Sequence, residues 1–284
     1  MAEIIYGSIL AKQFKEELKR KTEVLVASNK RLPKLVVILV GDNPASISYI
    51  KGKSKACEEV GFLFELKHFP ETIQTEEMIE MIREYNNNEA VDGILIQMPI
   101  PGHLDEKRIV DNILPEKDVD GFHTANVGKL YNGEDGFVPC TPLGIMEILH
   151  SIPETIAGKE AVVLGRSRLV GTPVAQLLLR ENATVTICHS KTRDVEQHCK
   201  QADILVVAIG KRHFVKGDWI KEGAIVIDVG VNRYEDGKLY GDVEFESAKE
   251  VASYITPVPR GVGPMTITML LQNTWKAYCD KEGE

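Results

Sequence analysis

The sequence lacks any apolar run of the roughly 20 residues that a membrane-spanning helix needs. Its densest run, LVVILV at residues 35–40, has the length of a buried strand. The N-terminus also lacks an apolar secretory core and an Arg-rich transit peptide, because Glu3 and Glu16 interrupt it. We therefore expect a soluble, cytoplasmic protein with no membrane partner.

Cysteine is scarce, and its spacing forms no recognisable site. The five cysteines include no C-x-x-C pair; they are Cys57, Cys140, Cys188, Cys199 and Cys279. An odd and scattered set disfavours both a disulfide framework and a structural zinc site. We expect reduced thiols that serve as small apolar residues. The sequence also contains no H-E-x-x-H or other metal set, so no metal is expected.

An excess of positive charge is absent as well: 34 Lys and Arg stand against 42 Asp and Glu, a net charge of -8. This balance disfavours nucleic acid as a partner, although a local basic patch remains open. Hydrophobic residues, at 43%, are in the usual range for a globular protein. At ~150 residues per domain, the length predicts two domains, each with a core of its own.

What the sequence does contain is an alternation of strand-like and helix-like segments, which predicts an α/β fold. The strands expected in the first half are 35–40, 62–69 and 93–98, and the helices are 8–28 with Ser8 as the cap, 46–60 and 75–86. Residues 115–139 have few periodic apolar positions and are expected to form a long loop at a domain boundary. Thr141-Pro142 has the pattern of a helix N-cap followed by a first-turn proline.

The second half repeats the alternation with the β-α-β spacing of a dinucleotide-binding unit. The expected strands are 160–165, 184–188, 204–209 and 224–229, and the helices are 171–181 and 265–279. Between the first strand and helix the sequence reads G-x-S-x-x-x-G-x-P, from Gly165 to Pro173. The turn lacks the usual G-x-G-x-x-G, yet a helix N-terminus there still offers amides to a pyrophosphate. A plain loop with two glycines is the alternative.

The end of the next strand favours NADP over NAD. An NAD site usually has Asp or Glu there, to bind the ribose 2′-hydroxyl. Here the strand runs into His189-Ser190-Lys191 with no carboxylate. Ser190, Lys191 and Arg166 from the first turn would suit a 2′-phosphate, because an Arg fork donates two bonds to such a group. Solvated loop residues are the alternative.

The first half contains a Y-x-x-x-K, Tyr49 to Lys53, on an expected helix. Residues four apart lie on one helix face. A half-buried tyrosine beside a surface lysine is one interpretation, and a short-chain dehydrogenase motif is another. In that class, however, the motif follows the dinucleotide turn, whereas here it precedes it in the other domain. Gln97 ends a strand, Asp118 and Asp120 lie in a loop, and 256–266 is a rigid loop rich in Pro and Gly, or an interdomain linker.

These segments together resemble the bifunctional methylenetetrahydrofolate dehydrogenase/cyclohydrolase (FolD) family. The resemblance covers nearly the whole chain in family order, through VGDNPASISYIKGKSKACEEVG, DGILIQMPIPGHL, PEKDVDGFH, PCTPLG, VVLGRSRLVGTPVAQLL, CHSKT and TPVPRGVGPMT. It implies NADP-dependent oxidation of 5,10-methylenetetrahydrofolate to the methenyl cation, then hydrolysis to 10-formyltetrahydrofolate. That reaction pair serves one-carbon metabolism, including purine, methionine and histidine biosynthesis.

The resemblance also implies roles for individual residues. Tyr49 would stack on the folate ring, and Lys53 would be the main catalytic group of the hydrolysis. Gln97 would orient Lys53, and Asp120 would bind the pterin. Further folate contacts are expected at Pro257, Gly261, Gly263 and Pro264. NADP contacts are expected at Gly165, Arg166, Ser167, Ser190 and Val231.

The family's architecture implies two α/β domains around a cleft. The folate-binding catalytic domain would span residues 1–140, with the last helix, 264–284, packed back on it. A Rossmann-like NADP-binding domain with a parallel sheet would span residues 141–263, and the chain would form a homodimer through it. A monofunctional NADP-dependent dehydrogenase and a non-catalytic NADP- or folate-binding regulator remain as alternatives. Both Lys53 and Gln97 being present argues against the first.

Overall fold

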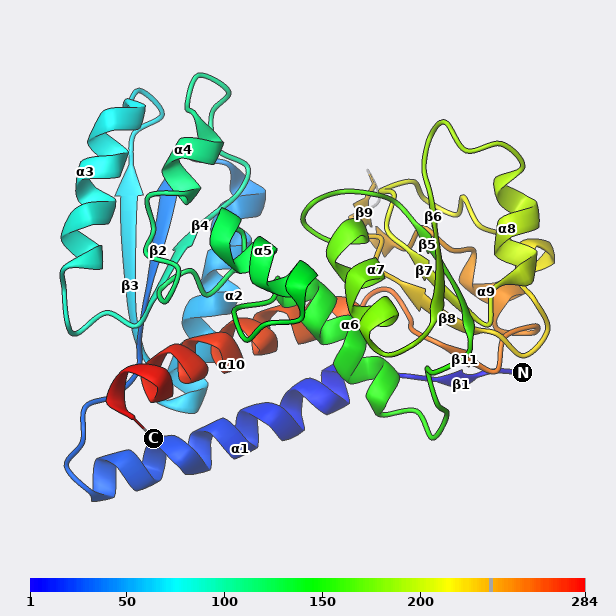
Figure 1. Cartoon of the computed structure of the whole chain (residues 1–284), viewed down its shortest axis with the longest axis horizontal. Coiled ribbons are helices and arrows are strands. Elements are labelled where there is room, and N and C mark those ends of the chain that lie inside the picture. Colours follow the sequence, from blue (N-terminus) through cyan, green and yellow to red (C-terminus); the bar gives the residue numbers. More distant parts are fainter. Residues whose placement is uncertain (235–236, 284) are drawn as a thin grey trace. The chain divides into compact units, whose positions relative to one another are not determined.

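The computed structural model describes residues 1–234 and 237–283, and the chain forms two compact units (Figure 1). The three-stranded unit contains residues 13–140 and 267 onward, and the six-stranded unit contains residues 1–12 and 141–266. Each division between the units falls inside a helix. These helices are α1 (Gly7–Ala27), α6 (Cys140–His150) and α10 (Val262–Glu282).

The three-stranded unit is built on a parallel sheet with the strand order β3-β2-β4. Its strands are β2 (Lys34–Val40), β3 (Leu63–Phe69) and β4 (Gly93–Ile96). All of β2 after Lys34 is buried, as its unbroken apolar run predicts. Alternate side chains of β2 pack in one core with α3 (Thr75–Asn86) and α4 (Glu106–Val110). The helix α2 (Pro44–Val60) contacts β2 and β3.

Local signals fix both ends of α2, the helix that holds Tyr49 and Lys53. The side chain of Asn43 accepts N–H bonds from Ala45 and Ser46 at 2.9 and 3.2 Å. Pro44 occupies the first turn, so the helix begins two residues before the predicted start. It ends at Gly61, whose φ of 81° is in the left-handed region that favours glycine.

The six-stranded unit is a doubly wound parallel sheet with the strand order β1-β11-β8-β7-β5-β6. Its strands are β1 (Glu3–Ile4), β5 (Glu160–Leu164), β6 (Thr184–Cys188), β7 (Ile204–Val207), β8 (Ile225–Asp228) and β11 (Tyr254–Ile255). Figure 1 shows α7 (Gly171–Arg180) on one side of this sheet, and α8 (Val195–Gln201) and α9 (Phe245–Ala248) on the other. The strands β9 (Asn232–Arg233) and β10 (Leu239–Tyr240) pair antiparallel in a separate two-stranded sheet. This arrangement is Rossmann-like.

The predicted catalytic domain, residues 1–140, includes a segment that belongs elsewhere. Residues 1–12 are part of the six-stranded unit. The amides of Glu3 and Ile5 donate to the carbonyls of Ser253 and Ile255 at 2.8 and 2.9 Å, which makes β1 an edge strand of that sheet. A two-residue strand carries too little periodicity for sequence analysis to detect.

Three helix predictions are also corrected. The predicted loop 115–139 contains α5 (Thr124–Asn132), which begins after a cap by His123 Nδ1. The first helix starts at Gly7, so Ser8 lies inside it and is not its cap. The helix α6 starts at Cys140, so Thr141 is also inside, and its hydroxyl hydrogen bonds with that of Thr266 at 2.9 Å.

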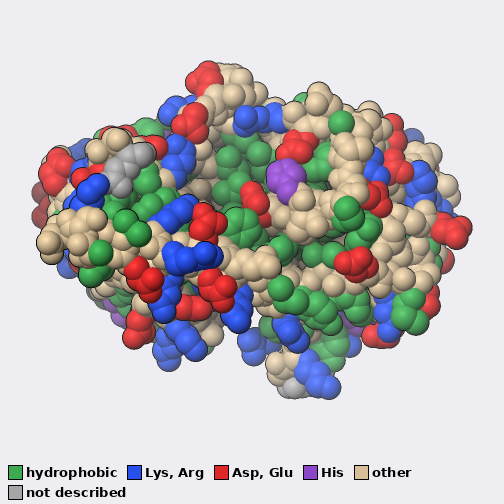
Figure 2. All heavy atoms as spheres, turned by 90° about the horizontal axis from the view of Figure 1, so that it is seen from below, with side chains coloured by type: hydrophobic (Ala, Val, Ile, Leu, Met, Phe, Trp, Pro, Cys, Tyr) green, Lys and Arg blue, Asp and Glu red, His purple; other side chains and the backbone are tan. Residues whose placement is uncertain are grey.

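The surface and the thiols agree with the composition. On the face that Figure 2 shows, basic and acidic side chains lie interspersed. All five cysteines are free thiols, four of them buried. Within residues 1–234 and 237–283, no helix is long and apolar enough to cross a membrane.

Candidate functional site

The structure brings Lys53 and Gln97 together in the three-stranded unit. Lys53 lies on α2, and its Nζ donates to Oε1 of Gln97 at 3.0 Å. Gln97 follows β4, and its backbone N–H donates to the carbonyl of Ile38 at 2.8 Å, which extends the hydrogen bonding of the sheet by one residue. Its Nε2 donates to the carbonyl of Met98 at 2.8 Å. The bond from Nε2 to Met98 orients the side-chain amide so that its oxygen points at Lys53.

Asp120 faces the same lysine. Burial lowers the pKa of Lys53, while the negative charge of Asp120 opposes that change. Burial raises the pKa of Asp120, opposed first by the charge of Lys53 and then by the polar thiol of Cys140 nearby. Each group therefore disfavours its own charge through burial and favours the charge of its partner. A lowered pKa makes the neutral, proton-accepting form of the amine more accessible.

Tyr49 lies one turn before Lys53 on α2 and is 51% exposed. Its ring is thus available to a ligand while Ile50, the next residue, is buried in the core. Residues four apart on a helix share a face, so Tyr49 and Lys53 lie on the same side of α2. An exposed aromatic ring on the same helix face as a partly buried amine suits a flat ring system with a reactive centre at one edge.

The loop that carries Asp120 is held by a buried carboxylate. Asp118 is 1% exposed and accepts N–H bonds from the backbone of Phe122 and His123 at 3.3 and 2.8 Å. It also accepts one from Asn126 Nδ2 at 2.8 Å. Asp118 is therefore a structural residue of the turn, and Asp120 is the carboxylate left for chemistry. Burial raises the pKa of Asp118 to about 7, against these three donors.

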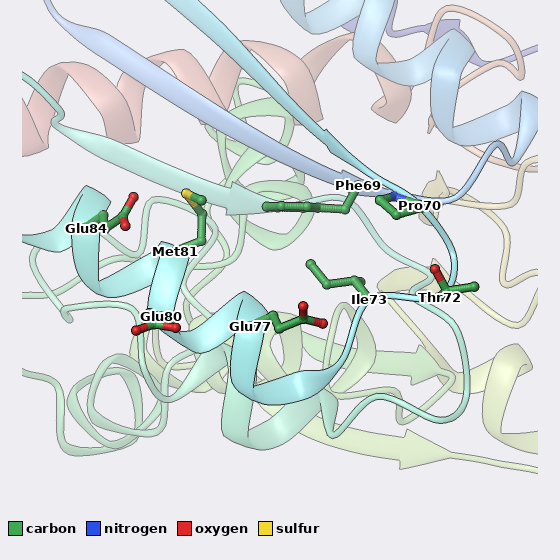
Figure 3. A pocket seen from close by; sticks show the side chains of 8 residues that line it. All are labelled: Phe69, Pro70, Thr72, Ile73, Glu77, Glu80, Met81 and Glu84. Carbon is green, nitrogen blue, oxygen red and sulfur yellow. The ribbon is translucent and has the colours of Figure 1, made fainter.

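A separate hollow of the three-stranded unit contains none of the candidate residues (Figure 3). Phe69, Ile73 and Met81 give it an apolar floor, and Glu77, Glu80 and Glu84 line it from α3. Three carboxylates disfavour an anionic ligand such as a folate. We therefore place the candidate chemistry at Lys53 and not in this hollow.

In the six-stranded unit, four strand ends lie in one row. Cys188 of β6 pairs with Leu164 of β5, which pairs with Val207 of β7, which pairs with Asp228 of β8. The segments that follow these strands contain Ser190, Arg166, Ile209 and Val231. They therefore leave the sheet at its carboxyl edge, where open α/β sheets bind ligands.

The turn after β5 requires both of its glycines. A Cβ on Gly165, whose φ is 126°, would lie 2.2 Å from the carbonyl oxygen of Ala208. A Cβ on Gly171 would lie 2.2 Å from the carbonyl oxygen of Gly165. Ser167 Oγ accepts N–H bonds from Val170 and Gly171 at 3.2 and 3.4 Å, at the start of α7. The turn thus brings the helix N-terminus close to the strand end, as a pyrophosphate site needs.

Arg166 and Ser190 emerge from neighbouring strands and are exposed. The amide of Gly165 donates to the carbonyl of Cys188 at 2.9 Å, so the two loops start side by side. The turn after β6 is rigid, because Thr192 Oγ1 accepts from the amide of His189 at 2.9 Å and the amide of Thr192 donates back to its carbonyl at 2.8 Å. A phosphate could be held between two such loops.

Val231 lies beyond a pair of buried carboxylates. Asp228 accepts N–H bonds from Gly230, Asp242 and Val243 at 2.9, 2.9 and 3.0 Å. Asp242 accepts from the backbone of residues 209–211 at 2.7, 2.9 and 2.8 Å. These bonds fix the loops that follow β7 and β8, and they leave Val231 48% exposed at their end.

The Pro- and Gly-rich segment is only partly a loop. The helix α10 begins at Val262, so Gly263 and Pro264 belong to its first turn. Pro257 and Gly261 lie in the tight turn before it, where a Cβ on Gly261 would lie 2.3 Å from the carbonyl oxygen of Pro257. Arg260 has a φ of 81°, unusual for a residue with a side chain, and its guanidinium lies 4.9 Å from the ring centroid of Tyr6.

Sequence analysis missed two residues of the first site. Cys140 was expected to be only a small apolar residue, yet its thiol donates to the carbonyl of Val119, the residue before Asp120, at 3.5 Å. Asn273 of α10 was not singled out, yet its amide reaches the carbonyl of Val119 at 2.8 Å. The motif PCTPLG could have drawn attention to Cys140. A lone polar residue on an apolar helix face was the available signal for Asn273.

Two family models match the chain in the order of its halves. The catalytic-domain model of the tetrahydrofolate dehydrogenase/cyclohydrolase family matches residues 5–120, and its NAD(P)-binding-domain model matches residues 139–282. The chain belongs to this family. Its curated relatives include the bifunctional protein FolD of Bacillus licheniformis, which is 56% identical over 276 residues, 97% of each chain.

Solved structures of the family have the same fold. The FolD methylenetetrahydrofolate dehydrogenase/cyclohydrolase of Campylobacter jejuni is 47% identical with a TM-score of 0.97, over 99% of each chain. The Trypanosoma brucei dehydrogenase-cyclohydrolase, complexed with NADP cofactor and an inhibitor, is 38% identical with a TM-score of 0.95, over 100% of this chain and 99% of that one. The predicted family, the two-domain α/β class with a parallel sheet, and an enzyme with both activities are therefore confirmed. The short-chain dehydrogenase alternative is set aside.

Proposed function

We propose that Lys53 is the proton acceptor of the cyclohydrolase reaction and that Asp120 binds the pterin of the folate. The enzyme is a bifunctional, NADP-dependent methylenetetrahydrofolate dehydrogenase and methenyltetrahydrofolate cyclohydrolase, as predicted. The contact between Lys53 and Gln97 supports the assignment most directly, because it joins the two residues that a hydrolytic site needs.

The hydrolysis would use Lys53 as a neutral amine. The methenyl group is a cation, so its carbon accepts water without a metal. As water adds to the methenyl carbon, Nζ of Lys53 takes one of its protons. The bond from that carbon to N5 then breaks, and the remaining hydroxyl proton passes to N5, which leaves the formyl group on N10. Burial already lowers the pKa of Lys53, and a cationic substrate would lower it further. Gln97 would keep Nζ oriented through its 3.0 Å bond.

The folate would be bound by side chains that match its parts. The aminopyrimidinone edge presents adjacent N–H donors, and the carboxylate of Asp120 can accept two of them. The ring of Tyr49 would stack on the bicyclic ring system. The contacts predicted at Pro257, Gly261, Gly263 and Pro264 lie in the six-stranded unit and stay predictions.

NADP is the cofactor, and when bound it accepts the hydride of the dehydrogenase reaction. The residues of the six-stranded unit fit it. The glycine turn from Gly165 to Gly171 would take the pyrophosphate at the start of α7, with Ser167 holding the turn. Arg166 and Ser190 would bind the 2′-phosphate. Val231, exposed at the carboxyl edge of the sheet, would contact the nicotinamide end.

One assay tests the two activities together. Purified protein is given methylenetetrahydrofolate with NADP or NAD, and the NADPH and methenyl species are followed separately. We expect NADPH formation, faster with NADP than NADH formation with NAD, and decay of methenyltetrahydrofolate to the 10-formyl product. NADPH formation with methenyltetrahydrofolate accumulating at the uncatalysed hydrolysis rate would instead favour the monofunctional dehydrogenase.

We also propose that the enzyme is a cytoplasmic homodimer that joins through the six-stranded unit. Its product would supply purine, methionine and histidine biosynthesis with one-carbon groups. The family resemblance supports each of these statements. Light scattering of the purified chain measures its mass, and a monomer at enzyme-assay concentrations would contradict the homodimer.

A further inference from the structure

Asn273 is a buried amide on an apolar helix face. It lies on α10, is 5% exposed, and has Leu270, Leu271 and Ala277 as buried neighbours on the same helix. Burying an amide is costly unless hydrogen bonds replace those that it makes to water. The structure shows that these bonds go to the residue before Asp120 and to a second segment, which contains Val138.

One nitrogen of Asn273 bridges two backbone segments. Nδ2 donates to the carbonyl of Val119 at 2.8 Å and to the carbonyl of Val138 at 3.0 Å. It also lies 3.8 Å from Sγ of Cys140. The two segments are otherwise in direct backbone contact, since a Cβ on Gly121 would lie 2.7 Å from the amide nitrogen of Pro139. Asn273 therefore spans a junction that has no room for a side chain at Gly121.

The carbonyl of Val119 belongs to the peptide group that leads into Asp120. A peptide group is planar, so a hydrogen bond to its oxygen fixes the orientation of the whole plane, including the amide nitrogen of Asp120. On the other segment, the thiol of Cys140 donates to the same carbonyl at 3.5 Å. Asn273 and Cys140 thus both bind the carbonyl that leads into Asp120.

We infer that Asn273 is a positioning residue for Asp120, acting from the C-terminal helix on a folate-binding carboxylate. The inference rests on the proposed role of Asp120. A carboxylate that accepts two parallel N–H bonds must have the correct tilt, and a displacement of 1 Å can lower activity by up to about 10²-fold. Without the amide of Asn273, the peptide plane before Asp120 keeps only the longer bond from the thiol of Cys140, so the plane and the carboxylate after it are held less firmly.

The test compares two neighbouring buried positions of α10. Asn273→Leu removes both donors at similar size, and Asn273→Ser is the milder variant in case the first does not fold. Thr274→Val is the matched control, because Thr274 is fully buried and its hydroxyl donates only within its own helix, to Leu270 at 2.8 Å. Each variant is measured for its melting temperature, for KM and kcat with both folate substrates, and for the KM of NADP.

We expect Asn273→Leu and Asn273→Ser to raise the KM of both folate substrates by about tenfold or more, with the KM of NADP unchanged. Thr274→Val should lower the melting temperature without changing the KM of the folate substrates or of NADP. In the background of Asp120→Ala, the Asn273 variants should cause no further loss, because the group they position is gone.

Three results would overturn the inference, and they show whether the role of Asp120 fails with it. If the Asn273 and Asp120 variants have additive effects, or if Thr274→Val raises the folate KM as much as Asn273→Leu does, Asn273 merely stabilises the helix, while the role of Asp120 stands. If Asp120→Ala alone leaves the folate KM unchanged, the proposed role of Asp120 fails, and the positioning role of Asn273 fails with it.

Discussion

Nζ of Lys53 lies 3.0 Å from Oε1 of Gln97, and this contact joins the helix α2 to the residue that directly follows the strand β4. The lysine donates and the amide oxygen accepts, so Gln97 holds the amine without placing a negative charge on it. Burial can then keep the pKa of Lys53 low, which a carboxylate in the place of Gln97 would prevent.

Replacement of Lys53 tests its catalytic role. Lys53→Met keeps the length of the side chain and removes the amine. Hydrolysis of methenyltetrahydrofolate should fall by ~10²–10⁴-fold, the usual contribution of an acid–base group. NADP binding should persist. Lys55→Met, at an exposed position of the same helix, is the control and should have nearly normal activity. A Lys53→Met enzyme with near-normal hydrolysis would refute the assignment.

Replacement of Gln97 tests the electrostatic argument through pH. Gln97→Glu places a carboxylate beside Nζ of Lys53, and an opposite charge at this distance should raise the pKa of the lysine by about 1–3 units. Because the neutral amine is the reactive form, hydrolysis rises as pH passes upward through that pKa. The rise in the pH–rate profile should therefore move to higher pH. Gln97→Met, which adds no charge, should lower the rate without this alkaline shift, and an unshifted Glu variant would contradict the model.

The role of Asp120 is tested by removing its acceptors. Asp120→Ala should impair both the dehydrogenase and the cyclohydrolase, because both act on one bound folate. Asp120→Asn should also be poor, since an amide replaces one acceptor with a donor. Kinetics with each folate substrate give the loss in kcat/KM, and Glu116→Ala, at an exposed position, is the control. Unchanged folate binding in both Asp120 variants would exclude the pterin contact.

Cofactor preference tests Arg166 and Ser190. A hydrogen bond to a charged group contributes roughly 1.5–3 kcal/mol, so Arg166→Ala should weaken NADP by about 10- to 100-fold. Ser190→Ala should act in the same direction. Use of NAD, which has no 2′-phosphate, should change little, and hydrolysis of supplied methenyltetrahydrofolate should be nearly intact. Equal losses in kcat/KM with NADP and NAD would mean that these residues only shape their loops.

Lys117 is predicted to contribute to stability and not to catalysis. It is 7% exposed, and its Nζ donates to the carbonyls of Tyr85, Asn86 and Asn88 at 3.0, 2.7 and 2.8 Å, at the C-terminal end of α3. Lys117→Met should lower the free energy of unfolding by about 2–4 kcal/mol, because one buried and two partly buried hydrogen bonds to a charged donor are lost.

Urea denaturation of the Lys117 variant measures that loss. Lys107→Met is the matched control, because its side chain is 75% exposed and its pair with Asp111 at 3.6 Å contributes little. Activity per folded molecule should be normal in both variants. A Lys117 variant that is as stable as the Lys107 variant would contradict the structural role.

Much of the fold could be predicted from local pattern. The run at 35–40 became the buried central strand β2, and α3 and β6 have the predicted bounds. Periodicity succeeds there because each segment is long enough to present a repeated apolar face. It fails for β1, which has two residues, and for α5, which buries only Asn126 and Leu130. The strand β1 depends on β11, far away in the sequence, whereas α5 depends on polar contacts such as the cap by His123, which leave no apolar period.

The sequence by itself determined the residue types of the chemistry: an amine four residues after a tyrosine, and a glycine turn with no acidic residue at the next strand end. Only the tertiary structure decided which of them meet. Gln97 hydrogen bonds with Lys53, and Asn273 with the carbonyl of Val119. The carboxylate of Asp118 accepts backbone N–H bonds, whereas that of Asp120 interacts with the charge of Lys53. The physical reason is that a sequence motif shows only which side chains are present. Their hydrogen bonds and burial depend on distances that exist only after the chain has folded.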